Sequence, residues 1–193
     1  MTITTIYEAA IGGTIEDFKE FYSPGSQNLA VEGGSTLLSY VIAYNDPVNR
    51  AAIANFLLDE GADPTWQDHR DGLTYLHALF GWFANKPVPQ GDLVLAARLL
   101  DGGADVNAVD NVSGTPLQEL TRRAVTHSER YAGPIYDLLF SRDDLDLFVR
   151  NARGNSTYRL AWRERDILPQ LWERVQRYVA DHGLTVPEGE IGG

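Results

Sequence analysis

The 193-residue chain contains no cysteine, and it has no long apolar run. The missing cysteine excludes disulfides, thiolate metal sites and a cysteine nucleophile. Residues 1–6 lack the basic stretch and apolar core of a secretory signal, and no segment approaches the roughly 18 apolar residues that cross a bilayer. We therefore expect a soluble, cytoplasmic protein with no membrane partner.

Basic residues are scarce: 16 Lys and Arg face 27 Asp and Glu, which gives a net charge of -11. Residues 1–109 hold 14 acids and 5 bases, whereas residues 110–193 hold 13 acids and 11 bases. Nucleic-acid binding depends on Lys and Arg that neutralise phosphates, so the composition argues against such a partner. The acidic half suits a basic protein partner, or else it only keeps the chain soluble.

Patterns that carry catalytic or cofactor chemistry are also missing. No histidine has a second ligand at metal-binding spacing on one helix face. The glycine pairs at 12–13, 33–34 and 102–103 lack both the Lys-Ser/Thr of a phosphate loop and the spacing of a dinucleotide fingerprint. We therefore predict no catalytic residue, no metal and no cofactor.

The chain does contain an internal repeat. Leu57–Asp63 and Leu99–Asp105 each place Leu-Leu before Gly-Ala-Asp, where the glycine can end a helix in the left-handed conformation. A third copy, Leu138–Asp144, keeps the leucines and loses the glycine. Four helix-start signals alternate with these copies along the chain. Their capping residues, which lie 38, 41 and 41 residues apart, are Thr36, Thr74, Thr115 and Ser156.

Further helices are predicted at both ends of the chain. Residues 6–21 indicate two short helices around a glycine turn, and residues 167–182 place their apolar side chains on one helical stripe that stops at Gly183. Because a repeat unit lies at each end, we predict one array over residues 1–185. Residues 186–193 are predicted to be a flexible tail.

At these residues the sequence resembles the ankyrin repeat, whose units carry Asp-x-x-Gly-x-Thr-Pro-Leu-His near the start and Leu-Leu-x-x-Gly-Ala-Asp-Val-Asn near the end. Gly103–Ala108, followed by Asp110 and Thr115–Leu117, is nearly complete. The units here are longer than the family's roughly 33 residues, as in irregular bacterial members. The resemblance implies an all-α solenoid of about five stacked helix-turn-helix units with short finger hairpins. In such a stack the Leu-Leu positions should be core.

The resemblance also implies where a partner binds, because the family usually holds its partner on the fingers and the concave first-helix faces. Trp66 beside Arg70 has the composition of an interface hot spot, although Trp66 packing on a neighbouring finger is the alternative. For the first-helix residues, burial in an irregular stack competes with partner binding. The candidate partner-binding residues are Trp66, Asp68, His69, Arg70, Val109, Asp110, Asn111, Tyr40, Tyr44, Trp82, Arg122 and Arg123.

A basic cluster near the C-terminus, Arg150 to Arg165, is interpreted as a solvated face whose arginines pair with neighbouring acids. The leading functional hypothesis is a non-catalytic protein-binding module that is a monomer when free. Its narrower form is a bacterial immunity protein that masks a cognate toxin, an idea that comes from analogy of fold. The alternative is an adaptor or regulatory protein that assists another enzyme, and an enzyme ranks third.

Overall fold

The computed structural model describes residues 3–29, 34–81 and 87–191. Over these residues the chain forms ten α-helices and no strand, and the helices take up roughly half of the chain. The predicted all-α class is therefore confirmed. The chain divides into two compact units. Unit 1 consists of residues 1–70, 74–79 and 89–104, and unit 2 of residues 71–73, 80–88 and 105–193.

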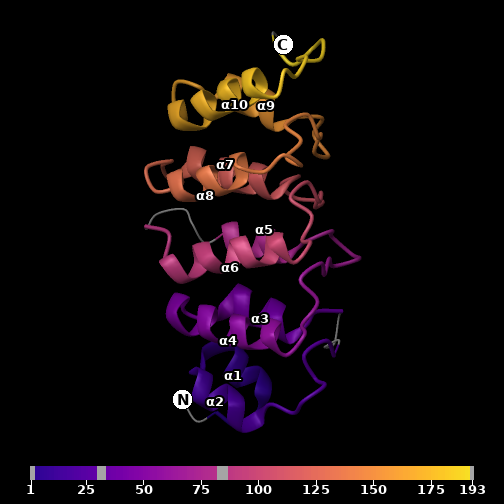
Figure 1. The fold of residues 1–193 in the computed structure, drawn as a ribbon, viewed down its shortest axis with the longest axis vertical. Coiled ribbons are helices and arrows are strands. Elements are labelled where there is room, and N and C mark those ends of the chain that lie inside the picture. The colour runs from indigo at the N-terminus through magenta and orange to yellow at the C-terminus, as the bar shows by residue number, and fades with distance from the viewer. Residues whose placement is uncertain (1–2, 30–33, 82–86, 192–193) are drawn as a thin grey trace. The chain divides into compact units, whose positions relative to one another are not determined.

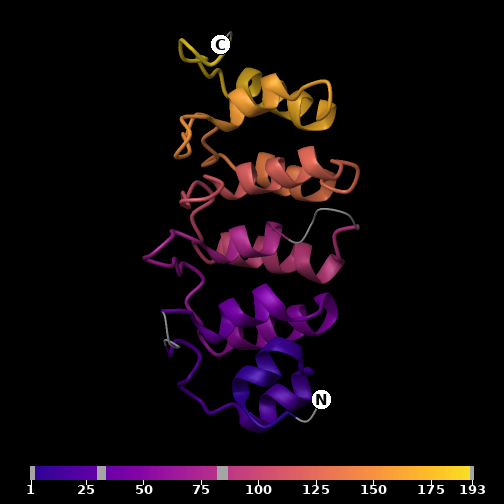
Figure 2. The same cartoon turned by 180° about the vertical axis from the view of Figure 1, so that it is seen from behind.

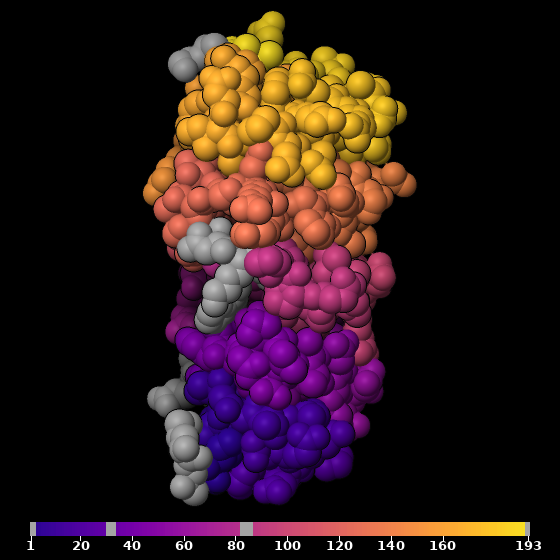
Figure 3. Space-filling view, turned by 90° about the vertical axis from the view of Figure 1, so that its left-hand side faces the viewer, coloured from indigo at the N-terminus to yellow at the C-terminus, as the bar shows by residue number. Residues whose placement is uncertain are grey.

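Unit 1 is built from consecutive helix–loop–helix segments (Figure 1). Helix α1 (Ile6–Gly12) lies against α2 (Ile15–Phe21) and α3 (Leu37–Tyr44). Helix α4 (Pro47–Asp59) lies against α2, α3 and α6 (Gln90–Asp101). In the space-filling view the indigo atoms of the first pair directly contact the purple atoms of the second (Figure 3). Unit 1 also contains α5 (Tyr75–Phe80), although the last residue of this helix is assigned to unit 2.

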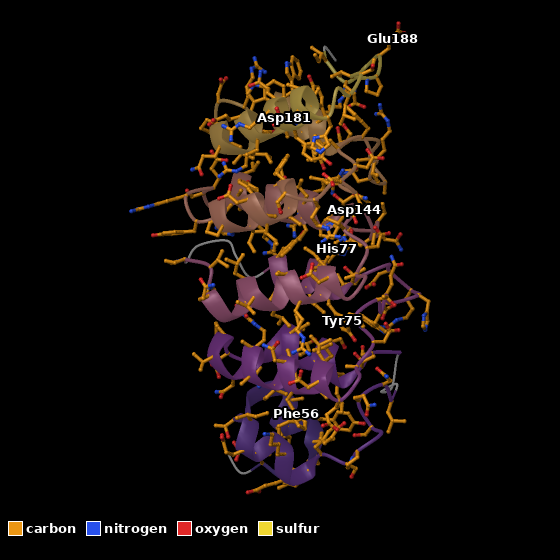
Figure 4. All side chains as sticks on the ribbon, in the orientation of Figure 1. Phe56, Tyr75, His77, Asp144, Asp181 and Glu188 are labelled. Atoms are coloured by element: carbon orange, nitrogen blue, oxygen red, sulfur yellow. The ribbon has the colours of Figure 1, made fainter. Side chains whose placement is uncertain are left out.

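Aromatic rings and aliphatic side chains fill the space between these helices. Phe56 of α4, labelled in Figure 4, packs edge-on against Phe18 of α2 and against Tyr22, with ring centroids 6.2 and 5.0 Å away. Ile53 and Leu57, which lie one turn apart on α4, are fully buried. One face of α4 is therefore committed to the core of unit 1.

Unit 2 repeats the arrangement with two helix pairs. Helix α7 (Pro116–Thr126) lies against α9 (Thr157–Arg163), and α10 (Pro169–Asp181) lies against both α8 (Gly133–Phe140) and α9. The polar segments that precede α7 and α9 project from the same end of their helices (Figure 2).

A side-chain amide ties successive loops together in each unit. In unit 2, Asn107 donates to the carbonyl of Asp144 (2.6 Å) and accepts from the amide of Asp146 (2.8 Å). In unit 1, Asn28 makes the same two bonds to Gly61 and Asp63. Each asparagine replaces the backbone pairing that a sheet would supply, so the loops keep a fixed register without strands.

The four predicted helix starts are confirmed. Thr36, Thr115 and Ser156 each accept a hydrogen bond from the backbone amide three residues on, and they cap α3, α7 and α9. Thr74 does the same for α5 through the amide of His77, at 3.5 Å. Such caps satisfy amides that have no partner within the helix.

The predicted glycine stops are also confirmed. Gly61 and Gly103 adopt φ of 87° and 100°, which L-residues avoid. The amides that follow, on Ala62 and Ala104, donate back to the carbonyls of Leu57 and Leu99 at 2.8 and 3.0 Å. This is the Schellman arrangement, which closes a helix and sends the chain into the next loop.

The details differ from expectation at three places. Leu58 and Leu138, which we expected in the core, are only half-buried, whereas their neighbours Leu57 and Leu139 are fully buried. The predicted finger hairpins are turns, and among the described residues pairing is limited to one isolated antiparallel bridge in unit 1, between positions 67 and 74. Within the expected tail, Glu190 is buried, and its carboxylate accepts from the Ser156 hydroxyl and from Arg150.

An ion pair is buried in the core of unit 1. Arg50 of α4 and Asp92 of α6 are 1% and 0% exposed, and they form a two-pronged pair with nitrogen–oxygen distances of 3.0 and 2.5 Å. The guanidinium also donates to the carbonyl of Asn45 (3.3 Å). Two charges removed from water are tolerated only when each satisfies the other, so this pair fixes how α4 and α6 approach.

Replacing Leu100 with alanine should lower the free energy of unfolding by about 2–5 kcal/mol, because the side chain is buried and truncation leaves a cavity. The matched variant Leu58→Ala should cost clearly less, because Leu58 is half exposed to solvent. Urea unfolding followed by circular dichroism measures both changes. Equal losses for the two leucines would contradict the packing described.

Breaking the buried ion pair should be more damaging than removing it. Asp92→Leu leaves the Arg50 guanidinium buried without its carboxylate, and we expect a loss of about 3–5 kcal/mol. The double variant Arg50→Met/Asp92→Leu should recover most of that loss, because no uncompensated charge remains. Urea unfolding of the two variants provides the comparison. A double variant no more stable than Asp92→Leu would show that the pair does not act as described.

Candidate protein-binding surface

The finger that contains Trp66 was expected to bind a partner, but its tryptophan packs within unit 1. The Trp66 ring is half-buried and stacks on Tyr75 of α5 with centroids 5.1 Å apart, and its indole nitrogen donates to the carbonyl of Gly34 (3.2 Å). Tyr75, labelled in Figure 4, is itself held by a 2.7 Å hydrogen bond to Thr36. The structure thus favours the packing alternative for Trp66, because its aromatic face and its donor both have partners.

Asp68 requires a correction, because its side chain is buried rather than available to a partner. The carboxylate accepts from the backbone amide of Arg70 at 2.8 Å and from its guanidinium at 2.9 Å, so it shapes the turn. His69 and the outer part of Arg70 are exposed. These two side chains remain accessible at the finger tip.

The other predicted finger, around Asp110 in unit 2, likewise has a buried aspartate next to exposed residues. Asp110 is buried, and its carboxylate accepts from the backbone amides of residues 112–114 at 3.0, 2.5 and 2.8 Å. This aspartate therefore builds the turn and does not face a partner. Val109 and Asn111 are exposed, and the Asn111 amide donates to the carbonyl of Asp71 (2.7 Å).

Arg122 and Arg123 of α7 share one buried carboxylate. The Glu119 side chain accepts from both guanidinium groups at 2.7 and 2.8 Å and from the Ser113 hydroxyl. Burial alone would raise the pKa of Glu119, but the hydrogen bonds from Ser113, Arg123 and Arg122 outweigh it and hold the pKa below its usual value of 4.5. Glu119 thereby anchors the two arginines on α7, and both remain partly exposed.

The tyrosines expected at first-helix positions do form a surface. Tyr40 and Tyr44 lie one turn apart on α3 with ring centroids 5.8 Å apart, and Tyr7 of α1 lies 6.1 Å from Tyr40. Tyr7 and Tyr44 are 43% and 61% exposed, and Ile11, one turn after Tyr7, is exposed as well. We call Tyr7, Ile11, Tyr40 and Tyr44 the tyrosine face. Trp82 lies outside the described residues.

The surroundings of the tyrosine face are acidic. Residues 1–60 carry eight acidic residues against only Lys19 and Arg50. Arg50 is buried in its ion pair, and Lys19 lies over the ring of Phe56, 5.0 Å from the centroid. Glu8 follows Tyr7 on α1, and Asp46 caps α4 two residues after Tyr44. The exposed tyrosines therefore sit on a part of the chain with a strong excess of negative charge.

The C-terminal arginines pair only partly as predicted. Arg163 binds Glu164 at 2.8 Å, in line with the expectation. Arg150 instead binds Glu190 at 2.5 Å, and Arg159 donates to the carbonyl of Gly189 (2.8 Å). The Arg150 contact could not be predicted from local spacing, because its acidic partner lies 40 residues away in a segment without periodicity.

Within the described ranges, no cluster of three or more His, Asp or Glu side chains is placed to hold a metal ion. None of the helices in the described parts of the chain is both long and apolar enough to span a membrane. His77 is buried, and its Nδ1 accepts from the amide of Thr74, so it supports the start of α5.

Comparisons with known proteins identify the fold but no family. No protein-family model matches the sequence, and no curated protein matches it. The chain is similar to the crystal structure of a functionally unknown protein from Leptotrichia buccalis C-1013-b. The sequences are 24% identical, the TM-score is 0.69, and the match covers 94% of this chain and 96% of the other. This likeness shows a shared fold and carries no information about activity.

The Glu119 anchor predicts a dependence of stability on pH. A carboxyl whose pKa is lowered in the folded state stabilises the fold above its unfolded pKa, and this contribution disappears as pH falls through the lower folded value. Stability should therefore drop as pH decreases below about 4.5. The variant Glu119→Gln should be less stable than wild type at pH 7 and should lose less on acidification.

Urea unfolding at pH 7 and at about pH 3.5 measures this difference, and Glu188→Gln serves as the control. Glu188 is exposed in the C-terminal segment, as Figure 4 shows. The Glu188→Gln variant should therefore show the same pH dependence of stability as wild type. If Glu119→Gln follows the wild-type pH profile, the carboxylate is not the anchor of the two arginines.

Proposed function

We propose that this chain is a non-catalytic, irregular ankyrin-type repeat protein that binds a basic protein through the tyrosine face of unit 1. The repeat assignment is supported by the hydroxyl caps at Thr36, Thr74, Thr115 and Ser156 and by the left-handed glycines that close α4 and α6. These features recur in step along the chain, and they fall at the positions that the family pattern gives them.

The observation that carries the proposed function is the exposure of the tyrosine face. Tyrosine supplies a large, rigid contact area with a polar end, and it is enriched among residues that dominate binding energy. The leucines of α3 and its Val41 and Ile42 are buried, yet Tyr7 and Tyr44 stay in solvent. Adjacent exposed aromatic rings on a folded surface mark an interaction site more often than isolated ones do.

The charge of the surroundings favours a basic partner. The excess of acids over residues 1–60 creates a negative potential that attracts a positively charged protein and speeds its encounter. A bacterial immunity protein that covers the basic substrate groove of a toxin fits this chemistry, and so does an adaptor that holds a basic client. The partner's identity separates the two roles: an immunity protein abolishes its partner's activity, whereas an adaptor preserves it.

The test is a comparative capture from lysate of the native organism, followed by binding measurements with the purified partner. Wild type should retain a basic protein that the double variant Tyr40→Ala/Tyr44→Ala does not retain. With purified partner, the double variant should bind at least about 2 kcal/mol more weakly, which is the range of hot-spot losses. The association rate of wild type should fall as salt concentration rises.

Phe21→Ala is the control, because Phe21 is a partly exposed aromatic residue on α2 and does not belong to the tyrosine face. It should bind like wild type, and all three chains should have similar helical circular dichroism. A double variant that binds normally, or an acidic partner whose association is indifferent to salt, would refute the proposal.

A further inference from the structure

Unit 2 carries a groove that the tyrosine face does not involve. The groove has a volume of about 280 Å³ and is lined by residues of α7 and α9 and by the turns that precede them. Both helices and both turns belong to unit 2, so the groove is complete within it. Its lining residues include three arginines, Arg122, Arg153 and Arg163, and the aliphatic residues Val112, Val125 and Leu160.

Two of the three arginines already have carboxylate partners. Arg122 binds Glu119 at 2.7 Å, and Arg163 binds Glu164 at 2.8 Å. The Arg153 guanidinium forms no ion pair or hydrogen bond with any residue that the structure describes. Arg153 is therefore the one lining arginine whose guanidinium has no carboxylate partner among the described residues.

The backbone at Arg153 is nevertheless fixed. Its amide donates to the side-chain oxygen of Asn151 (3.0 Å), which also accepts from the amide of Asn155 (3.1 Å). The side-chain nitrogen of Asn151, Nδ2, donates to the carbonyl of Ser113 in the preceding turn (3.3 Å). Because Asn151 joins the two turns, the backbone of Arg153 is held beside the groove.

The apolar part of the groove is also exposed. Val112 and Val125 are 66% and 38% exposed, and Leu160 is half-buried. Aliphatic side chains beside this one arginine match a ligand that has an apolar group next to one negative charge. A peptide with adjacent acidic and aliphatic residues has this chemistry.

We propose that the groove between α7 and α9 binds an acidic peptide segment of a partner protein, with one carboxylate on Arg153 and an aliphatic side chain against Val125 and Leu160. A guanidinium pairs with a carboxylate through two parallel hydrogen bonds, which fixes orientation as well as charge. The inference does not rest on the proposed function, because the tyrosine face lies within unit 1.

A carboxylate suits the groove better than a phosphate does. A phosphate group carries between one and a half and two negative charges and calls for several cations. Here Arg122 and Arg163 already bind Glu119 and Glu164, so only Arg153 among the three lining arginines can give a ligand both of its parallel hydrogen bonds. The repeated phosphates of a nucleic acid would be disfavoured further by the net charge of -11 on the chain.

The test is an NMR titration of the full-length chain, observed at the arginine Nε–H signals. The probe is the blocked peptide acetyl-Gly-Asp-Leu-Gly-amide, and the matched probe replaces Asp with Asn. The Asp peptide should shift the Arg153 signal and saturate, and the Asn peptide should bind about tenfold more weakly, because a charge-assisted hydrogen bond is lost. The variants Arg153→Gln and Val125→Ser should each weaken binding of the Asp peptide by about fivefold to tenfold.

Arg177→Gln is the control, because Arg177 is an exposed arginine of α10 that pairs with Glu173 outside the groove. It should leave peptide binding unchanged. Equal binding of the Asp and Asn peptides, or an undiminished affinity in Arg153→Gln, would overturn the proposal. So would inorganic phosphate or a short single-stranded oligonucleotide that saturates the Arg153 signal at lower concentration than the peptide. The probes are directed at the groove of unit 2, so a negative result in this titration does not bear on the proposal that the tyrosine face binds a partner.

Discussion

Burial of one helix pair against the next is the interaction on which each unit depends. The first helices of the pairs are 6–11 residues long, which is too short for stable helices in water. They persist because α1 packs on α3 in unit 1 and α7 packs on α9 in unit 2. Several of these first helices also keep side chains in solvent, among them Tyr7 of α1, Tyr44 of α3 and Val125 of α7. Both candidate binding surfaces include such side chains.

The polar interior serves this packing and supplies little for chemistry. The carboxylates of Asp68, Asp110 and Glu119 are buried and accept hydrogen bonds from the turns or arginines around them. The Arg50–Asp92 pair sets the approach of α4 to α6 by mutual satisfaction of two buried charges. Groups that are fully engaged in holding the fold are not available for proton transfer or ligand binding. The accessible chemistry is therefore that of surfaces, which is the basis for proposing recognition and not catalysis.

The sequence predicted the elements better than the site. The caps and glycine stops were predictable because each acts locally: Thr115 needs only the amide of Gln118, and Gly103 needs only its own positive φ. The exposure of Tyr44 and the burial of Asp110 were not predictable, because both depend on how turns and helices distant in sequence pack. Trp66 shows the same limit, since its partners Gly34 and Tyr75 are set by the fold and not by spacing.

The central claim is that a partner protein covers the tyrosine face, and hydroxyl-radical footprinting of the complex tests it most directly. Tyrosine side chains react according to their exposure, so free and bound chains can be compared residue by residue. Tyr7 and Tyr44 should lose reactivity when the purified partner binds, while Tyr131 of unit 2 should react as before. Unchanged reactivity of Tyr7 and Tyr44 in a saturated complex would contradict it.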